Sequence, residues 1–386
     1  MITKRIYGWL ILSAFYVLCF SQSDVQKSLR FNGQIVGWAN VQMDNPVFWQ
    51  PGARFVPSLT WKQSITSNTT FDAEASLNIY GNADFRNFKT DTLNGQIKPY
   101  RVWLRYSNQN FELRAGLQKI NFGQARMFRP LMWFDGKDVR DPLQLTDGVY
   151  GLLAKYFFEN NANIWAWGLL ANENRKGWEL FGSEKWKPEL GGRVELPLLN
   201  GEIALSTHHR KVKAINLLSS QLNNFQLLNE SRFGLDGKWD VGPGIWFENS
   251  TTITQVNNIQ VPRYQDMWNF GLDYTFPLGN GLGMTVEYLR YHAGENFLTG
   301  GITMQFAGGM FTYPLSVVDN LSLMLFYEPI ANQLFNYASW SRNYDNWSIY
   351  AIVFVNPENA QMIGFQSGNR NLFAGKGFQV MCSYNF

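Results

Sequence analysis

The sequence predicts an all-β protein: a single transmembrane antiparallel β-barrel of about 18 strands, with 16 strands as the alternative. Of its 386 residues, 16% are aromatic and only 16% are charged, whereas about a quarter of the residues of a soluble domain are charged. The mean hydropathy is nevertheless slightly polar, at −0.23. Apolar and polar residues alternate along most of the chain. Together these observations disfavour a soluble enzyme, a disordered chain and a bundle of membrane helices.

The first 21 residues are typical of a secretory signal peptide. Lys4 and Arg5 form a basic start, residues 6–20 carry no charge, and Ser21 is a small residue before a cleavage point at Gln22. The charge-free run is shorter than the roughly 20 residues that cross a bilayer. An uncleaved membrane anchor and a lipoprotein signal at Cys19 are the alternatives. We expect a signal peptide at 1–21 and one barrel domain at 22–386.

Alternation with a period of two marks the expected strands, because side chains two residues apart lie on the same face of a strand. In residues 268–276, for example, every second residue is apolar or aromatic, and the residues between them are Asn, Gly, Asp and Thr. Many apolar faces end in aromatic residues, as expected for the girdles of membrane barrels. The expected strands are 29–43, 54–66, 69–82, 99–107, 110–121, 146–158, 162–173, 186–197, 201–210, 228–241, 244–256, 265–277, 282–292, 299–313, 320–329, 333–342, 346–355 and 376–386.

One segment, residues 296–318, carries no charge and is long enough for a membrane helix. However, Ile302, Met304 and Phe306 alternate with polar neighbours, and the segment contains two Gly-Gly pairs and Pro314. This pattern favours a strand.

The lengths of the connections support the barrel independently. Short links follow the even-numbered strands, whereas long ones follow odd-numbered strands at 83–98, 122–145, 174–185, 211–227 and 356–375. Bacterial barrels have short periplasmic turns and long extracellular loops. The short link 330–332 is an exception on the long-loop side.

The last expected strand also predicts the location. Phe378, Val380, Cys382, Tyr384 and Phe386 share one face, and the chain ends on Phe386. This ending resembles the insertion signal of bacterial outer-membrane barrels. The resemblance implies the outer membrane of a Gram-negative cell, with Phe386 and Tyr384 as the barrel-insertion signal.

If the apolar faces meet lipid, the charged residues between them face the lumen, because a charge on the lipid face is costly. These residues include nine bases and nine acids, so they form either neutral wall networks or a charged pore lining. They are Arg101, Arg105, Glu112, Arg114, Lys155, Lys187, Glu189, Arg193, Glu195, Glu202, Arg210, Glu230, Arg232, Asp236, Lys238, Asp240, Asp273 and Glu287.

The loop at 123–145 is unusual because it carries six large apolar residues: Met127, Phe128, Leu131, Met132, Trp133 and Phe134. Such a loop would expose a large apolar area in water, so we expect it to fold into the barrel and narrow it. Packing on the barrel rim is the alternative.

Residues 113–123, followed by Asp141-Pro142, resemble the strand-then-loop pattern of porins and alginate-export-like barrels. The resemblance implies a constriction in which loop residues Asp135, Asp138 and Asp141 face wall residues Arg101, Arg105 and Arg114, with Glu112 and Lys155 beside them. The chain departs from this pattern because its loop also carries four bases: Arg126, Arg129, Lys137 and Arg140.

The sequence offers little catalytic chemistry. It has three histidines, His208, His209 and His292, without metal-binding spacing, and Ser206 with His208 lacks a visible third partner. We therefore expect no enzyme activity, cofactor or metal.

The leading hypothesis is a porin-like channel for passive diffusion of small polar or charged solutes. The alternative is a non-conducting barrel subunit of an assembly or secretion complex. An exporter of anionic polysaccharide is a third option, against which the balance of lumenal charges counts. Expected partners are outer-membrane lipid and lipopolysaccharide, the barrel-assembly machinery during insertion, and small solutes, but not nucleic acid. Other membrane subunits and self-association remain open.

Overall fold

The computed structural model describes residues 27–386 except 45, 88, 216–224, 257–260 and 359–371. The expected signal peptide lies outside the described residues. Within the described part, no helix is long and apolar enough to cross a membrane.

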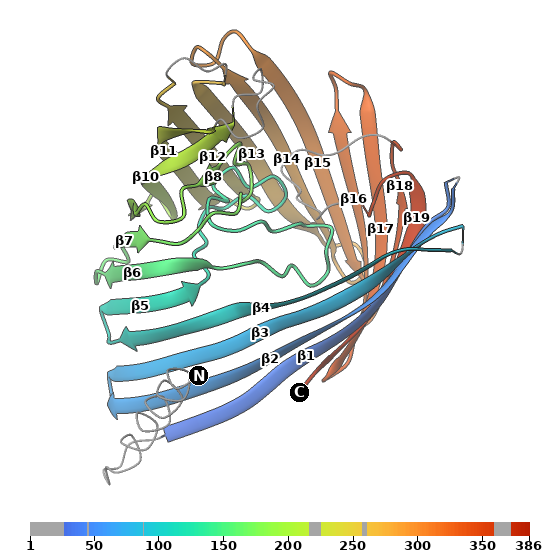
Figure 1. Cartoon of the computed structure of the whole chain (residues 1–386), viewed down its shortest axis with the longest axis horizontal. Helices are drawn as coiled ribbons and strands as arrows, with labels where there is room; N and C mark the ends of the chain where they lie inside the picture. The colour runs from blue at the N-terminus through green and yellow to red at the C-terminus, as the bar shows by residue number, and fades with distance from the viewer. Residues whose placement is uncertain (1–26, 45, 88, 216–224, 257–260, 359–371) are drawn as a thin grey trace, which may run out of the picture.

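The described residues form 19 strands in one sheet (Figure 1). They are β1 (Lys27–Gln42), β2 (Phe48–Thr66), β3 (Thr69–Arg86), β4 (Lys89–Ser107), β5 (Phe111–Gln118), β6 (Val149–Phe157), β7 (Asn163–Leu169), β8 (Gly182–Ser183), β9 (Glu189–Leu198), β10 (Gly201–Ile215), β11 (Phe225–Asp240), β12 (Gly244–Thr254), β13 (Tyr264–Phe276), β14 (Leu282–Gly294), β15 (Ile302–Pro314), β16 (Asp319–Glu328), β17 (Gln333–Asn343), β18 (Trp347–Val355) and β19 (Lys376–Asn385).

Eighteen of these strands close into an antiparallel barrel, which confirms the predicted fold class and strand number. Each wall strand pairs with its neighbours in sequence, and β7 pairs with β9. The two-residue β8 instead adds to β10 beyond the end of β9. The first and last strands close the ring, with Val36 opposite Ser383. At the same seam, Gly33 and Phe386 exchange two backbone hydrogen bonds of 3.0 Å.

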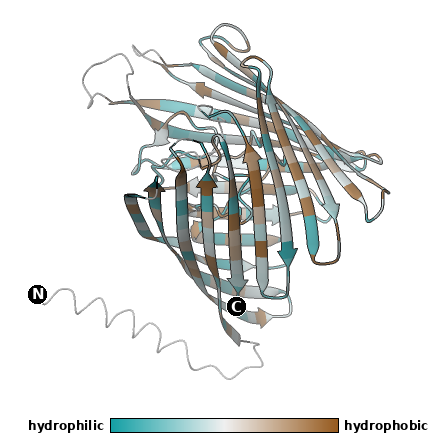
Figure 2. Cartoon of the chain, turned by 90° about the vertical axis from the view of Figure 1, so that its right-hand side faces the viewer, coloured by the Kyte–Doolittle hydropathy of each residue, from teal (hydrophilic) through white to brown (hydrophobic). Residues whose placement is uncertain are grey.

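The two faces of the wall differ as the alternation predicts. On β13, Phe270, Leu272 and Tyr274 are exposed on the outside, whereas the Asn269 side chain is buried within the barrel. On β19, Val380 is exposed while Gln379 and Ser383 are buried. Figure 2 shows apolar residues recurring along the strands of the outer surface. Lipid can solvate such an exterior, so the polar alternates collect inside.

The connections also follow the predicted rule. Every turn after β2, β4, β6, β9, β11, β13, β15 and β17 has five residues or fewer. The opposite end carries the long β5–β6 loop (119–148) and β7–β9 loop (170–188), together with short connections at 43–47, 87–88 and 329–332. The expected loop at 211–227 is too long, because β10 continues to Ile215 and β11 begins at Phe225; residues 216–224, and 359–371 of the expected loop at 356–375, lie outside the described residues.

The prediction of a long loop at 83–98 is wrong. Strands β3 and β4 continue through it as a paired ribbon, with Leu93 opposite Ala83 and a turn at Asn87. The segment is polar, but a ladder is built from backbone groups and tolerates polar side chains on both faces. Arg86 and Asp91 also pair across the ribbon at 3.1 Å.

Two further expectations have clear outcomes. Residues 302–314 form strand β15, as the alternation in the charge-free segment predicts. Lys187 does not lie in a wall strand: β9 begins only at Glu189, and Lys187 is exposed in the preceding turn. Pro188 explains the late start, because proline has no N–H for a ladder.

The wall has uneven height. Strands β5, β6, β7 and β9 have 7 to 10 residues, whereas β1 to β4 have 16 to 19. The long loops leave the wall where it is low and lie within the curve of the sheet (Figure 1). The candidate site is formed there.

Candidate functional site in the barrel lumen

The β5–β6 loop turns into the barrel directly after β5. Gly123 has a φ of 91°, a conformation that glycine adopts at little cost. A Cβ at this position would collide with the carboxylate of Glu248 on β12. The sequence thus needs a glycine at Gly123 for two reasons, backbone conformation and close approach to the wall.

Two buried carboxylates hold the loop against the wall. Glu248 accepts hydrogen bonds from the backbone N–H groups of Ala125 at 2.6 Å and Leu131 at 3.3 Å. Glu287 on β14 accepts from Arg126 at 2.6 Å, Met127 at 3.2 Å and Phe128 at 2.9 Å. Both glutamates are 1% exposed. Because a buried carboxyl group without partners is strongly unfavourable, these N–H groups stabilise both the buried carboxyl groups and the loop position.

Two apolar clusters fix the same loop on different parts of the wall. On one side, Phe128 packs against Phe306 of β15 and Phe326 of β16, with ring centroids 5.9 and 5.8 Å apart. On the other, Phe134 packs against Trp167 of β7 at 5.4 Å. The loop is therefore folded into the barrel, as its apolar composition predicts, and contacts several strands there.

The β7–β9 loop is a second inward segment that the sequence analysis missed. Trp178 donates to the Phe128 carbonyl at 2.8 Å, and Gln265 of β13 donates to the Trp178 carbonyl at 2.7 Å. Glu179 pairs with both Arg210 and Arg232 at 2.8 Å. A tryptophan in a mostly polar loop was the available signal for this docking.

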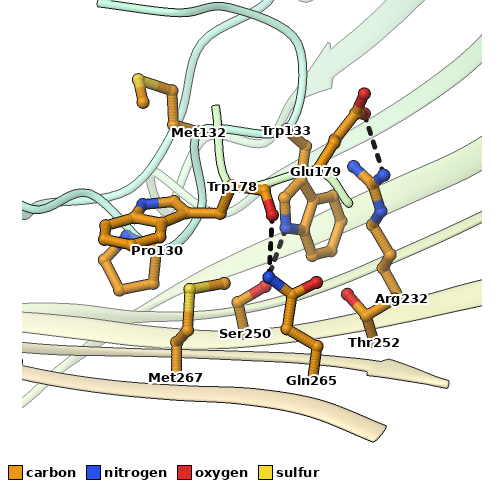
Figure 3. Close-up of a pocket in the computed structure, with 10 residues that line it drawn as sticks. All are labelled: Pro130, Met132, Trp133, Trp178, Glu179, Arg232, Ser250, Thr252, Gln265 and Met267. Carbon is orange, nitrogen blue, oxygen red and sulfur yellow. Dashed lines mark hydrogen bonds and ion pairs between the residues drawn. The ribbon is translucent and has the colours of Figure 1, made fainter. Parts of the chain in front are cut away.

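Figure 3 shows a small pocket where the two loops meet β11, β12 and β13. In it, Trp133 donates to Ser250 at 2.9 Å, beside the Gln265–Trp178 and Arg232–Glu179 contacts. It is lined by Pro130, Met132, Trp133, Trp178, Glu179, Arg232, Ser250, Thr252, Gln265 and Met267.

Many wall charges neutralise one another. Arg193 pairs with Asp236 at 2.6 Å and with Glu195 at 3.0 Å. Arg210 pairs with Glu230 at 2.6 Å. Such pairs satisfy buried charges but contribute little net stability by themselves. They correspond to the neutral wall networks that the sequence analysis left open.

The wall residues expected at the constriction have partners on the wall or at the loop end. Arg105 contacts Asp72 at 2.6 Å and Glu112 at 3.4 Å, and Arg114 contacts Glu112 at 2.9 Å. Asp72 was not among the expected residues. Arg101 donates to the Thr146 carbonyl at 2.8 Å.

Lys155 is the exception among these residues. Its Nζ lies 3.6 Å from the ring centroid of Trp165 on β7. It therefore makes a cation–π contact rather than an ion pair with the loop.

The loop residues mostly pair within the loop. Asp135 lies 3.6 Å from Arg129, and Asp138 lies 2.7 Å from Arg140. Asp141 accepts from the Leu143 N–H at 3.0 Å. In the described part of the chain, no ion pair joins these aspartates to Arg101, Arg105 or Arg114. Two of the four loop bases, Arg129 and Arg140, explain this difference from the pattern implied by the resemblance, because they pair with the loop acids Asp135 and Asp138.

Arg126 also has a carboxylate partner, but on the wall. It pairs with Asp273 of β13 at 2.6 Å and lies over the ring of Trp246 at 5.6 Å. Together with Glu248 and Glu287 it ties the start of the loop to the far wall.

His208 and Ser206 each contact neighbouring residues of the barrel wall. His208 is buried between Trp167, which donates to it at 3.1 Å, and Glu189 at 3.0 Å. Ser206 instead accepts from Arg193 at 3.1 Å. Among the described residues there is no group of three side chains placed to hold a metal ion.

The C-terminal aromatic residues lie at the seam of the barrel. Phe386 packs against Phe31 of β1 with ring centroids 5.6 Å apart and against Tyr384 at 6.2 Å. Their role as an insertion signal remains a prediction.

Comparison with known proteins gives a fold-level answer. No family model matches the chain, and no curated protein matches it. Among solved structures, it is similar to the Vibrio cholerae outer-membrane protein OmpT in its trimer form, with 11% identity, a TM-score of 0.50 and coverage of 93% of this chain and 99% of that one. It is also similar to Salmonella typhi OmpF in complex with daunomycin, with 10% identity, a TM-score of 0.50 and coverage of 93% and 97%.

A third similar structure is Wzi of Escherichia coli, described as an outer-membrane protein involved in group 1 capsule assembly and as a carbohydrate-binding β-barrel. Its identity is 11%, its TM-score is 0.53, and the alignment covers 92% of this chain and 84% of Wzi. At such identities the likeness concerns the fold. With its closed 18-strand wall, apolar exterior and charged interior, the chain has the porin-like fold of outer-membrane β-barrels.

Proposed function

We propose that the protein is an outer-membrane channel through which small polar or charged solutes diffuse passively, narrowed by the β5–β6 loop. The supporting observation is that this loop crosses the barrel interior and is anchored there by Glu248 and Glu287. A constriction lined by charged groups selects solutes by size and charge.

The charged side chains of β4 and β5 support the same function. Arg105 and Arg114 keep 29% and 18% of their side-chain surface exposed, and both pair with Glu112. These groups are within reach of water, unlike the buried Arg193–Asp236 and Arg210–Glu230 pairs on β9 to β11. A hydrated charged strip beside a fixed loop is the expected lining of a narrow pore.

The first test is single-channel conductance of the protein, residues 22–386, folded in detergent and added to planar bilayers. Steps proportional to salt concentration are expected. A cysteine at Lys155, in a Cys382→Ser background, should let a charged thiol reagent alter the current. Lys211→Cys in the same background is the matched control, because Lys211 is exposed on β10 and its modification should leave the current unchanged.

The alternative is a non-conducting subunit of an assembly or secretion complex. The similarity to Wzi, itself described as a capsule-assembly barrel, favours keeping this candidate. Bilayers that stay silent although the barrel is folded, together with a stoichiometric partner after detergent extraction, would replace the channel by this function.

A further inference from the structure

We propose that the free edge of strand β4, over residues 92–97, binds an extended segment of a partner protein as an added strand, at the end of the barrel that carries the long loops. This surface lies on the rim of the wall and not in the lumen, so the proposal does not depend on the channel proposed above. It rests on a backbone edge that the neighbouring strand leaves uncovered.

Strand β4 is paired on one side along its whole length, but on the other side only near its β5 turn. Its ladder with β3 runs from Lys89 to Ser107, whereas β5 pairs only with residues 102–107. No other backbone hydrogen bond of the described residues reaches 92–97. Every second residue of an antiparallel edge directs its N–H and C=O away from the paired neighbour, so about three residues in 92–97 offer free backbone groups.

The edge is accessible to a partner. Residues 89–97 are all exposed, and Leu93 and Ile97 are 77% and 70% exposed. Strand β4 has 19 residues, whereas about 9–11 residues cross a bilayer. Its far part therefore extends beyond the lipid, and Figure 1 shows it running well past the end of β5.

The edge lacks the features that normally prevent strand addition, which are charges, prolines and bulges. Residues 92–97 are Thr-Leu-Asn-Gly-Gln-Ile, with neither a charge nor a proline. The two irregularities of the β3–β4 ladder lie on either side of this stretch, at 84/85 and at 76/77 of β3. The edge is therefore regular where it is uncharged, as a ladder with an added strand requires.

The side chains of β4 define the chemistry of the partner segment. Leu93 and Ile97 share one face of the strand, and Thr92, Asn94 and Gln96 share the other. Side chains directly opposite each other on neighbouring strands stabilise a sheet when they are alike in polarity. The partner segment therefore alternates aliphatic and small polar residues.

The charges at the two ends of the edge add a preference for an acid. Lys98 at one end pairs with Asp147 at 2.6 Å, and Asp91 at the other end pairs with Arg86 at 3.1 Å. Lys89, beyond Asp91, has no ion-pair partner among the described residues. An acidic residue at the corresponding end of the partner segment would pair with it.

A wall strand of a second copy does not fit this edge. Two barrels in one membrane are related by an axis along the membrane normal. Barrel strands are tilted by about 35–45°, so the facing walls of two copies would cross at roughly 70–90° instead of forming a ladder. We therefore assign the edge to a different protein.

The test uses a short synthetic peptide that alternates valine and threonine and ends in glutamate. It is titrated into the detergent-folded protein of residues 22–386, and amide hydrogen exchange of β4 is measured. Bound peptide should slow exchange at alternate residues of 92–97, because the amides between them already bond to β3. The fully N-methylated peptide has no backbone N–H to donate and should leave this exchange unchanged.

Leu93→Lys with Ile97→Lys introduces the kind of charge that protects native edges. It should weaken peptide binding by roughly tenfold, which corresponds to about 1.4 kcal/mol. Leu190→Lys is the matched control and should bind the peptide as the unchanged protein does. Leu190 is also exposed, at 61%, but it lies on β9, which is paired on both sides there.

Unchanged exchange at 92–97 in millimolar peptide would overturn the proposal, as would equal slowing by the N-methylated peptide. Slow exchange that appears without peptide and strengthens with protein concentration would assign the edge to a second copy, which also overturns it. These outcomes are measured on the unchanged protein, so they decide the matter even if a lysine variant fails to fold.

Discussion

The carboxylate of Glu287 offers the sharpest test of how the β5–β6 loop is held. Its two oxygens accept the N–H groups of Arg126, Met127 and Phe128 at 2.6 to 3.2 Å. A hydrogen bond contributes about 0.5–1.5 kcal/mol to a neutral carboxyl group and about 1.5–3 kcal/mol to a charged one. With partial compensation by entering water, Glu287→Ala should weaken docking of the loop by roughly 3–6 kcal/mol.

The assay is amide hydrogen exchange of the folded barrel in detergent. A loss of about 3 kcal/mol corresponds to roughly hundredfold faster exchange, because 1.4 kcal/mol is a factor of ten. The effect should be confined to the loop amides, since the ladder of β14 with β13 and β15 is unchanged. Glu287→Gln keeps one accepting oxygen and should give an intermediate effect.

Glu202→Ala is the matched control. Glu202 also contacts the loop, but among the described residues its hydrogen-bond donor is the side chain of Gln124 and not a loop N–H. It should leave exchange at residues 126–128 unchanged. If Glu287→Ala folds and those amides still exchange as slowly as in the unchanged protein, the carboxylate does not hold the loop and the reasoning is wrong.

Three other predictions follow. Glu179→Ala should free the β7–β9 loop and cost about 3–5 kcal/mol, because Arg210 and Arg232, both buried, would then share the Glu230 carboxylate alone and one positive charge would lose its partner; limited proteolysis detects the freed loop, and an uncut loop would contradict the prediction. Trp133→Phe and Ser250→Ala should each destabilise loop docking by about 0.5–1.5 kcal/mol, because each removes the hydrogen bond between Trp133 and Ser250. The double variant should therefore lose no more stability than either single variant. Additive losses in denaturant titrations would refute this prediction. Burial raises the pKa of Asp141, so its ionised form opposes docking at neutral pH, and Asp141→Asn should stabilise the loop there. That gain should vanish below a pH of about 4, where the carboxyl is protonated in both states; a gain that persists in acid would show another cause.

Much of the wall could be predicted from the sequence because it depends on local patterns. A period of two places Phe270 outside and Asn269 inside without reference to any other strand. Loop lengths then order the strands, and the closing strand is marked by its aromatic face ending at Phe386. The ribbon at 83–98 was missed since its polar residues carry little β signal, although the backbone ladder continues through them.

The site was predicted only in part. The apolar residues of the β5–β6 loop indicated that it folds inward, because water is a poor solvent for six large side chains. The acids and bases of the constriction were named, but not their pairing. Asp138 lies near Arg140 in sequence and pairs with it locally, whereas the resemblance had placed the loop acids opposite wall arginines.

The sequence by itself determined the barrel, its inner and outer faces and the presence of an inward loop. The tertiary structure decided which wall groups hold that loop. Glu248 and Glu287 lie more than a hundred residues from the N–H groups that they accept, so no local pattern connects them. No local pattern connects Glu179 with Arg210 and Arg232 either, because they lie 31 and 53 residues away along the chain. Such contacts depend on which distant strands are brought together when the barrel closes. These hydrogen bonds and ion pairs stabilise the protein only after the barrel has closed.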